Sequence, residues 1–345
     1  MTVPVSFSSP PRRILIMKPS SLGDIVHALP VFNLLRRRFP QAHITWLVAP
    51  YCAGLLKGLE GLDEIMLFDR RRLGAAWWNP KALLELLQLH RELRRRQFDL
   101  VIDLQGLFRS GWMAWQSGAP IRIGFANARE LAWIFYTHRV PIETMEQHAV
   151  DRYLKIAAAL GCDSGPTEFR FPTTEADRQA VGKLLPRGER IAVLMPGANW
   201  ITKRWPAERF AALVELLKER FGLRSVIAGG KDAAEVAGRI PGAIDLTNKT
   251  TIPQLVALLE RADLVVANDS GPMHIAAALG RPLVTLFGPT NPVRTGPYAR
   301  PEAVVRANID CAPCYRRQCP HSRCLRELGI EPVLSAVEKQ LHPTK

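Results

Sequence analysis

One stretch, residues 264–290, constrains the fold of this chain more than any other part of its sequence. It reads LVVANDSGPMHIAAALGRPLVTLFGPT. Residues 264–267 are a short apolar run of the length of a buried strand, and residues 273–279 are small and apolar, as in a helix that packs tightly on a sheet. Gly280 ends that helix, and residues 283–287 form a second buried strand. The stretch therefore predicts a βαβ unit.

The turn inside this unit predicts a place where an anion can bind. The first N–H groups of a helix have no intrahelical partner, and the helix dipole adds positive potential there. Asp269, Ser270, Gly271 and His274 place polar groups at that helix start. A plain strand-to-helix turn with Asp269 as the N-cap explains the same residues equally well.

The alternation of strands and helices occurs in two blocks. We expect strands at residues 13–17, 44–48, 64–68, 99–104 and 121–125, and then at 190–195, 224–228, 243–246, 264–267, 283–287 and 303–306. Such alternation is typical of parallel α/β sheets. Gly, Pro and Thr cluster at residues 161–174 between the blocks, as in an interdomain linker.

The predicted fold class is therefore α/β, with two Rossmann-like, doubly wound domains facing a central cleft. We place the first domain at residues 12–165, the second at 172–328, and a C-terminal helix and tail at 329–345. The helix carries one apolar face, and we expect it to pack back on the first domain.

Charge and hydropathy narrow the class of partner and the location. The chain has 345 residues and a net charge of +14, which points to an anionic partner. No apolar run approaches the roughly 20 residues that a membrane span needs, and the N-terminus lacks a signal-peptide pattern. We therefore expect a cytoplasmic protein. No nucleic-acid-binding motif is present, which disfavours nucleic acid as the partner.

Two common nucleotide-binding fingerprints are missing from both blocks. Neither contains GxGxxG or a Walker lysine motif, which disfavours an NAD enzyme or a P-loop kinase. Two Rossmann-like domains without these fingerprints fit a sugar-nucleotide transferase or epimerase, whose ligand binds at the strand carboxyl ends.

The loop after the first predicted strand is polar and carries an acid. Asp24 follows Gly23 at a predicted helix start, where it could take a proton from an attacking hydroxyl. The alternative is a helix cap worth about 1 kcal/mol. Pro30 lies within the helical pattern that follows, so we expect a kink or a later helix start there.

The loop at residues 196–206 follows the first strand of the second block. Lys203 precedes a predicted helix start and can reach a diphosphate as a point charge. Asn199 and Thr202 can bond phosphate or sugar oxygens. The alternative is a solvated loop that Trp205 anchors in the core.

Four cysteines form a C-x2-C-x4-C-x4-C pattern near the C-terminus, namely Cys311, Cys314, Cys319 and Cys324. In a reducing compartment, disulfides are disfavoured. Two interpretations stay open: four reduced thiols in a basic loop, or a structural site for Zn²⁺ or iron whose four sulfurs would close the coordination shell.

A basic and aromatic surface is predicted in the first domain. A long helical pattern covers residues 70–97, with arginines at 70–72 and 91–96 and with Trp77 and Trp78 nearby. Such a run is either a solvated helix face or a site for a membrane surface or an anionic acceptor.

Several of these motifs together resemble glycosyltransferase family 9, the ADP-heptose:lipopolysaccharide heptosyltransferases. They are KPSSLGD near the N-terminus, VIDLQGLFRS, KRWP, NDSGPMHIAAALG and LFGPT, in the family's order. The resemblance covers nearly the whole chain, from about Ile14 to about Leu341. It implies a GT-B fold, with the acceptor on the first domain and the nucleotide sugar on the second. It also implies inverting transfer that requires no metal or other cofactor for catalysis.

The resemblance assigns expected roles to individual residues. Asp24 would be the catalytic base, and Lys203 would hold the diphosphate. Donor-side contacts are implied for Asn199, Thr202, Asp269, Ser270, Gly271 and His274. The acceptor-side loop residues are implied to be Lys18, Ser20, Ser21, Gly23 and Gln105. Ala198 and Asn199 stand where some members carry paired threonines, so the phosphate contacts would differ from those members.

The expected partners are ADP-heptose and a lipid-linked saccharide acceptor, with peripheral contact with the inner membrane surface as a further interpretation. Two other functions remain as alternatives. One is a non-hydrolysing nucleotide-sugar epimerase, which shares the two-domain layout. The other is a basic nucleic-acid-binding protein whose cysteine cluster acts as a zinc knuckle; it leaves the polar motifs at the strand ends unexplained.

Overall fold

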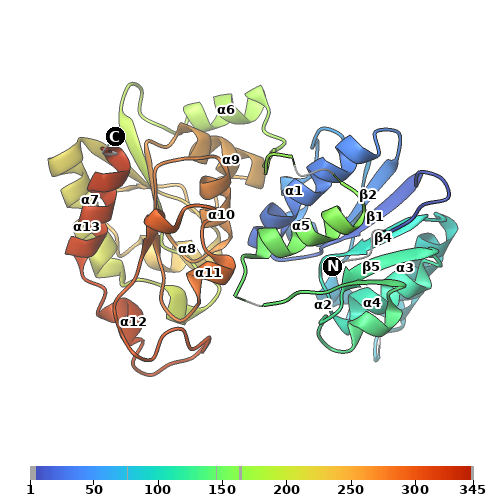
Figure 1. Ribbon diagram of the computed structural model, residues 1–345. Helices are drawn as coiled ribbons and strands as arrows, with labels where there is room; N and C mark the ends of the chain where they lie inside the picture. Colours follow the sequence, from blue (N-terminus) through green and yellow to red (C-terminus); the bar gives the residue numbers. More distant parts are fainter. Residues whose placement is uncertain (1–4, 76, 145, 163–164, 343–345) are drawn as a thin grey trace. The chain divides into compact units, whose positions relative to one another are not determined.

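The chain divides into two units at the Pro172–Thr173 boundary. The computed structural model describes residues 5–75, 77–144, 146–162 and 165–342; the last tail residues, 343–345, lie outside this range. Each unit contains a six-stranded parallel sheet with helices packed against it (Figure 1). Two doubly wound α/β sheets confirm the fold class expected from the alternation of strands and helices.

The first sheet has the strand order β3-β2-β1-β4-β5-β6. Its strands are β1 (Arg13–Met17), β2 (His43–Val48), β3 (Glu64–Leu67), β4 (Leu100–Asp103), β5 (Ile121–Phe125) and β6 (His138–Val140). Its helices are α1 (Leu22–Arg38), α2 (Arg70–Leu73), α3 (Pro80–Arg95), α4 (Phe108–Gln116) and α5 (Ala149–Ala159), with 3-10 turns η1 (Pro50–Leu55) and η2 (Ala132–Phe135).

Helices cover both faces of the first sheet. Leu15 and Met17 of β1 pack in one cluster with Leu93 of α3 and Met113 of α4. On the other face α1 packs beside α5 and against β2. This division follows from the strand geometry, because successive side chains point to opposite faces.

The second sheet has the strand order β12-β11-β10-β7-β8-β9. Its strands are β7 (Arg190–Met195), β8 (Leu223–Ile227), β9 (Ile244–Asp245), β10 (Leu264–Asn268), β11 (Leu283–Leu286) and β12 (Val304–Val305). Its helices are α6 (Glu175–Gly182), α7 (Ala207–Phe221), α8 (Lys231–Ala237), α9 (Ile252–Arg261), α10 (Gly271–Ala278), α11 (Pro292–Thr295), α12 (Arg323–Arg326) and α13 (Ile330–Leu341), with 3-10 turns η3 (Ile201–Lys203) and η4 (Pro301–Ala303).

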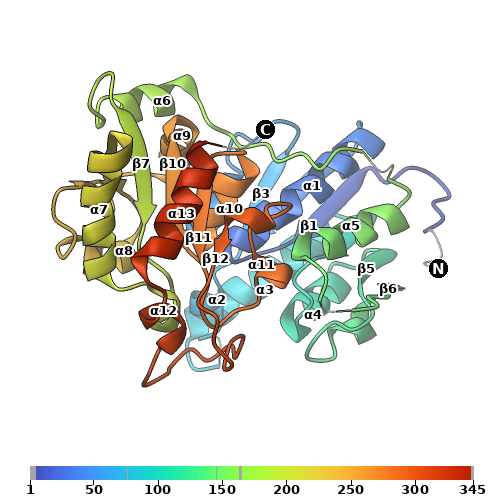
Figure 2. The ribbon, with the colours of Figure 1, turned by 60° about the vertical axis from the view of Figure 1, so that its left-hand side comes forward.

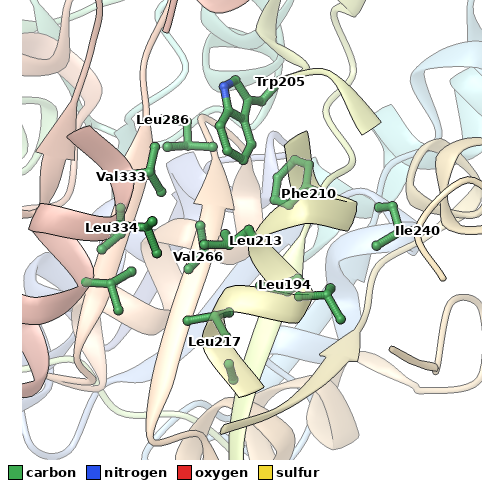
Figure 3. Packing of buried hydrophobic residues seen from close by; sticks show 14 of the residues in the cluster. Leu194, Trp205, Phe210, Leu213, Leu217, Ile240, Val266, Leu286, Val333 and Leu334 are labelled. Atoms are coloured by element: carbon green, nitrogen blue, oxygen red, sulfur yellow. The ribbon is translucent and has the colours of Figure 1, made fainter. Parts of the chain in front are cut away.

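The C-terminal helix α13 packs on the second sheet, which corrects the expectation that it returns to the first domain. Val333, Leu334 and Val337 are buried in one cluster with residues of α7, β10 and β11 (Figure 3). Figure 2 shows α13 across β10 and β11. The apolar face was correctly identified, but a face pattern does not say which sheet it covers.

Several local features differ from the sequence expectation. The helical pattern at residues 70–97 is two helices, because Asn79 caps a new start: its side chain accepts from the N–H groups of Lys81 and Ala82. Helix α1 begins at Leu22 and continues through Pro30, so the later helix start is wrong, whereas a kink at Pro30 stays a prediction. The short strand β6 and the helix α6 were not predicted.

No helix within the described residues has both the length and the apolar character that crossing a membrane requires.

Candidate functional site

The predicted site residues cluster at one point in each sheet, where the order of the strands reverses. In the first unit, β1 and β4 are neighbours, and the chain runs outward from them to β3 on one side and to β6 on the other. In the second unit, β7 and β10 are neighbours in the same way. Open α/β sheets bind ligands at the carboxyl ends of the strands at such reversals.

The Lys18–Asp24 corner lies at the end of β1. Ser21 is the N-cap of α1, and its backbone N–H and its hydroxyl both donate to Oδ2 of Asp24, over 2.9 and 2.8 Å. Nζ of Lys18 lies 3.7 Å from Oδ1 of the same carboxylate. Asp24 is thus part of the capping box rather than the N-cap, and its side chain stays 37% exposed. A partly exposed carboxylate held in this way can accept a proton.

Lys18 is a buried charge that this corner keeps protonated. Burial by itself would lower its pKa, but the charge of Asp24 and the contact with Tyr153 outweigh burial and raise the pKa above the usual value. The ammonium lies 5.3 Å from the ring centroid of Tyr153 and donates to the carbonyl of Leu104, 3.1 Å away. Tyr153, on α5, is a contact that sequence reasoning missed.

The loop after β4 brings Gln105 to the same sheet end. The N–H groups of Gln105 and Gly106 donate to Oδ1 of the buried Asp103, over 2.8 and 3.1 Å. Tyr136 donates to Oδ2 over 2.7 Å. Burial nevertheless raises the pKa of Asp103. Oε1 of Gln105 is buried and accepts no hydrogen bond from the part of the chain that the structure describes, which leaves an acceptor for a ligand or water. Of the remaining loop residues, Ser20 is half-buried and Gly23 is buried.

The Lys203–Asp269 corner lies at the ends of β7 and β10. Nζ of Lys203 is 2.6 Å from Oδ2 of Asp269, and the hydroxyl of Thr290 donates to that oxygen over 2.5 Å. Lys203 also lies 4.6 Å from the ring centroid of Trp200. Thr290 follows β11, and nothing in the sequence pairs it with Asp269. The three strands β7, β10 and β11 therefore meet in one charged cluster.

Ser270 is the N-cap of α10, so Asp269 does not have the capping role considered as its alternative. The Ser270 side chain makes no capping bond, and its buried hydroxyl oxygen has no hydrogen-bond partner among the described residues. Buried polar groups are usually paired, so this hydroxyl is available to a ligand or to water. Gly271 is the first helical residue of α10, and the N-terminus of a helix favours an anion.

Asn268 is a buried residue of this corner that sequence reasoning missed. Its side-chain amide donates to the carbonyl of Pro196 over 2.7 Å and accepts from the N–H of Trp205 over 3.2 Å. It thereby fixes both ends of the loop that carries Lys203. The sequence gives no signal for this role, because it depends on β10 lying next to β7.

The other expected donor-side residues differ in position. Thr202 is buried and donates to the carbonyl of Arg316 over 2.8 Å, so its hydroxyl joins two loops. Asn199 is exposed on the same loop as Lys203. His274 is buried in the first turns of α10.

A second cation lies beside Lys203. The guanidinium of Arg317 is 4.9 Å from the ring centroid of Trp200, the ring that Lys203 also contacts. Arg317 lies on the loop after β12. The backbone N–H groups of Cys314 and Tyr315 hold this loop to the corner by donating to the carbonyl of Pro289. Arg317 makes no ion pair within the described part of the chain. Because Asp269 offsets part of the Lys203 charge, this guanidinium and the start of α10 add to the positive potential of the corner.

The four cysteines of the C-x2-C-x4-C-x4-C pattern lie on the loop after β12 and on α12. Among the described residues, no three His, Cys, Asp or Glu side chains are placed to hold a metal ion. Burial raises the pKa of Cys324, and negative charge on the other three sulfurs raises it further. Cys311 is exposed, whereas Cys324 is buried. A metal at these residues therefore stays a prediction.

Comparison with known proteins identifies relatives along nearly the whole chain. The family described as glycosyltransferase family 9 (heptosyltransferase) matches residues 86–324. Lipopolysaccharide heptosyltransferase 1 of Pseudomonas aeruginosa is 32% identical over 323 residues, which cover 90% of this chain and 88% of that protein.

Solved structures of similar proteins share the fold. A glycosyltransferase family 9 protein from Veillonella parvula matches with a TM-score of 0.80 and 25% identity, covering 96% of this chain and 97% of that one. The E. coli heptosyltransferase WaaC, solved with ADP, matches with a TM-score of 0.77 and 27% identity, covering 95% and 99%. These matches favour neither the epimerase nor the nucleic-acid-binding alternative.

Proposed function

We propose, since the chain belongs to glycosyltransferase family 9 (heptosyltransferase), that it transfers a heptose from ADP-heptose to a hydroxyl of a lipopolysaccharide-core acceptor with inversion at the anomeric carbon. The acceptor would be a lipid-linked saccharide, bound on the first unit. The nucleotide sugar would bind on the second unit. The enzyme would act in the cytoplasm, at the inner face of the plasma membrane.

The proposed reaction is a single displacement. Asp24 takes the proton of the acceptor hydroxyl, whose oxygen forms a bond to the anomeric carbon. The bond between that carbon and the diphosphate oxygen breaks at the same time, and ADP leaves with the electron pair. Lys203 and the N–H groups at the start of α10 stabilise the negative charge that builds on the diphosphate.

The observation that carries the proposal is the unpartnered hydroxyl of Ser270 beside the Lys203–Asp269 pair. An ion pair alone is common in structural networks. The Ser270 hydroxyl is different, because it is buried without a partner at a helix start and at a strand-order reversal. It can donate or accept a hydrogen bond there, and a diphosphate sugar offers many oxygens as partners. Asp269 would orient Lys203 and bond sugar hydroxyls.

No metal ion is required by the proposed chemistry, because cationic and N–H groups take the charge of the leaving diphosphate. The cysteine cluster would have a structural role if it binds Zn²⁺ or iron. Elemental analysis of the purified protein tests this separately. About one metal ion per chain, lost in a Cys314→Ser variant with unchanged transfer, is the expected result; a metal-free, fully active protein would contradict it.

The test of function has two parts. A screen of nucleoside diphosphates by thermal melting should show the largest stabilisation with ADP, since a ligand that binds only the folded protein raises the melting temperature by mass action. Incubation with ADP-heptose and a lipopolysaccharide-core acceptor should release ADP only when both are present. Conversion of the donor without acceptor would instead indicate an epimerase or a hydrolase.

A further inference from the structure

A surface of the first unit gathers exposed aromatic, aliphatic and cationic side chains that the proposed chemistry does not use. It comprises Trp77, Trp78, Leu83, Leu84 and Leu87, together with the exposed arginines Arg70, Arg71, Arg91 and Arg94. We call it the tryptophan–arginine surface. Its arginines and leucines lie on α2 and α3, which pack beside one another, and its tryptophans lie just before α3.

The apolar part of this surface is unusually open. Trp77 is 92% exposed and Trp78 is 77% exposed, the two highest values among the exposed large hydrophobic residues. Both lie just before Asn79, the cap of α3, where the backbone N–H groups of Trp78 and Asn79 donate to the carbonyl of Ala75. Single exposed apolar residues are ordinary, but a group of five beside one helix start marks an interaction site.

The leucines belong to the outward face of α3. Leu83 and Leu87 are spaced one helical turn apart, and Leu84 lies beside them. Other leucines pack the inward face of α3 against the core: Leu93 is fully buried, and Leu89 is partly buried against the same cluster. The exposed leucines are therefore not needed to attach α3 to its sheet.

The cationic part of the surface continues the same helix face. Arg91 follows Leu87 by one turn, and Arg94 follows Arg91 by three residues, so leucines and arginines form one stripe. Within the described ranges, neither Arg91 nor Arg94 makes an ion pair, whereas Arg72 and Arg95 pair with Glu85 and Glu92. A favourable contact with the helix dipole explains arginines in the last turn, but it does not explain the leucines and tryptophans.

We propose that the tryptophan–arginine surface docks the protein on an anionic lipid bilayer. The indole rings of Trp77 and Trp78 and the leucines enter the headgroup region, where tryptophan is preferred, and the arginines contact lipid phosphates. The combination of apolar side chains with unpaired cations matches such a bilayer in both polarity and charge. The inference rests on the proposed function in one point: the lipid-linked acceptor of that function would lie in such a bilayer.

Co-sedimentation with vesicles tests the docking. The protein should bind vesicles of phosphatidylglycerol and phosphatidylethanolamine at least 10-fold more strongly than vesicles of phosphatidylcholine. Trp77→Ala/Trp78→Ala and Arg91→Ala/Arg94→Ala should each weaken binding about 10-fold or more. Trp77→Phe/Trp78→Phe should keep most of it, because the apolar rings remain.

A matched control removes the same amount of charge elsewhere. Lys218 and Arg220 are exposed on α7 of the second unit. Lys218→Ala/Arg220→Ala should bind vesicles like the unaltered protein. Equal weakening in this control would show a non-specific effect of net charge and overturn the proposal, as would unaltered protein that does not bind the anionic vesicles.

Transfer to a water-soluble, deacylated acceptor separates docking from the proposed function. All the variants should transfer heptose to it with unchanged kcat/KM, since no membrane is present. A loss of this activity in the tryptophan or arginine variants would assign the surface to acceptor binding and overturn docking. If the unaltered protein transfers nothing, the proposed function fails, while the vesicle result still decides the docking.

Discussion

Lys203 and Asp269, which lie on loops after different strands, form an ion pair with Nζ and Oδ2 2.6 Å apart. The pair exists because β7 and β10 are neighbours in the second sheet, so their carboxyl ends place both loops together. The hydroxyl of Thr290 donates to the same oxygen. A cation positioned by a buried carboxylate is pre-organised for a further anion, since its side chain is already ordered.

The first prediction concerns this pair. Lys203→Met should weaken ADP binding by about 10- to 100-fold, because a charge-assisted hydrogen bond is worth roughly 1.5–3 kcal/mol. It should also lower the free energy of unfolding by about 3 kcal/mol, because Asp269 is left buried without a cationic partner. Calorimetric titration with ADP and denaturant unfolding measure the two effects. Unchanged ADP affinity would rule out the phosphate role of Lys203.

The second prediction concerns the proposed base. Asp24→Asn should reduce transfer by about 10²- to 10⁴-fold, because the amide cannot take the proton of the acceptor hydroxyl. ADP affinity should not change, since the substitution lies in the first unit. Steady-state kinetics and ADP titration check this pair of outcomes, and a variant with nearly full activity would exclude Asp24 as the base.

The third prediction concerns the unpartnered hydroxyl. Ser270→Ala should leave the free energy of unfolding within about 0.5 kcal/mol of the original, because no capping bond is lost. Donor affinity should fall about 5- to 10-fold, the effect of one ordinary hydrogen bond. The informative result is a loss of donor affinity with little or no loss of stability, measured by donor titration and by denaturant unfolding. A loss of stability with unchanged donor affinity would assign the hydroxyl to folding alone.

The fourth prediction is a pH dependence. Burial raises the pKa of Asp103 in the folded protein above its value of 3.8 in an unfolded chain. Between pH 3.8 and the pKa of the folded protein, the folded state therefore binds more protons than the unfolded state. The contribution of Asp103 to stability is lost as pH rises through the folded pKa. Asp103→Asn removes this titration.

The melting temperature of the Asp103→Asn variant should thus rise relative to that of the unaltered protein as pH increases from about 4, and the difference should level off above the folded pKa. Thermal melts of the two proteins at matched pH values measure the difference. A difference that stays constant, or that falls with increasing pH, would contradict the raised pKa.

The strands were the most predictable part of the fold, because each central strand is a short apolar run between turn residues. Arg13–Met17, Ile121–Phe125 and Arg190–Met195 agree with the sequence expectation. The strand His138–Val140 was missed because three residues with one buried side chain carry no periodic signal. The prediction that α13 packs on the first domain was wrong, because an amphipathic pattern identifies the buried face of a helix but not the sheet that it packs against.

The sequence predicted which residues make up the Lys18–Asp24 and Lys203–Asp269 corners better than it predicted the contacts within them. Polar residues after apolar strands indicated Asp24, Lys203 and Asp269. The contacts of Thr290 and Asn268 could not be predicted, because they depend on which strands are neighbours in the sheet rather than on distance along the chain.

The Lys203–Asp269 corner is assembled wholly within one unit: its ion pair, the N-cap Ser270, the Asn268 tie and the Arg317 loop all come from residues after Thr173. A chimaera that joins this half to the first half of a relative would keep every one of those contacts. If the nucleotide sugar binds this half and the acceptor binds the other, as proposed, nucleotide preference and acceptor choice would be separate, exchangeable traits of the two halves.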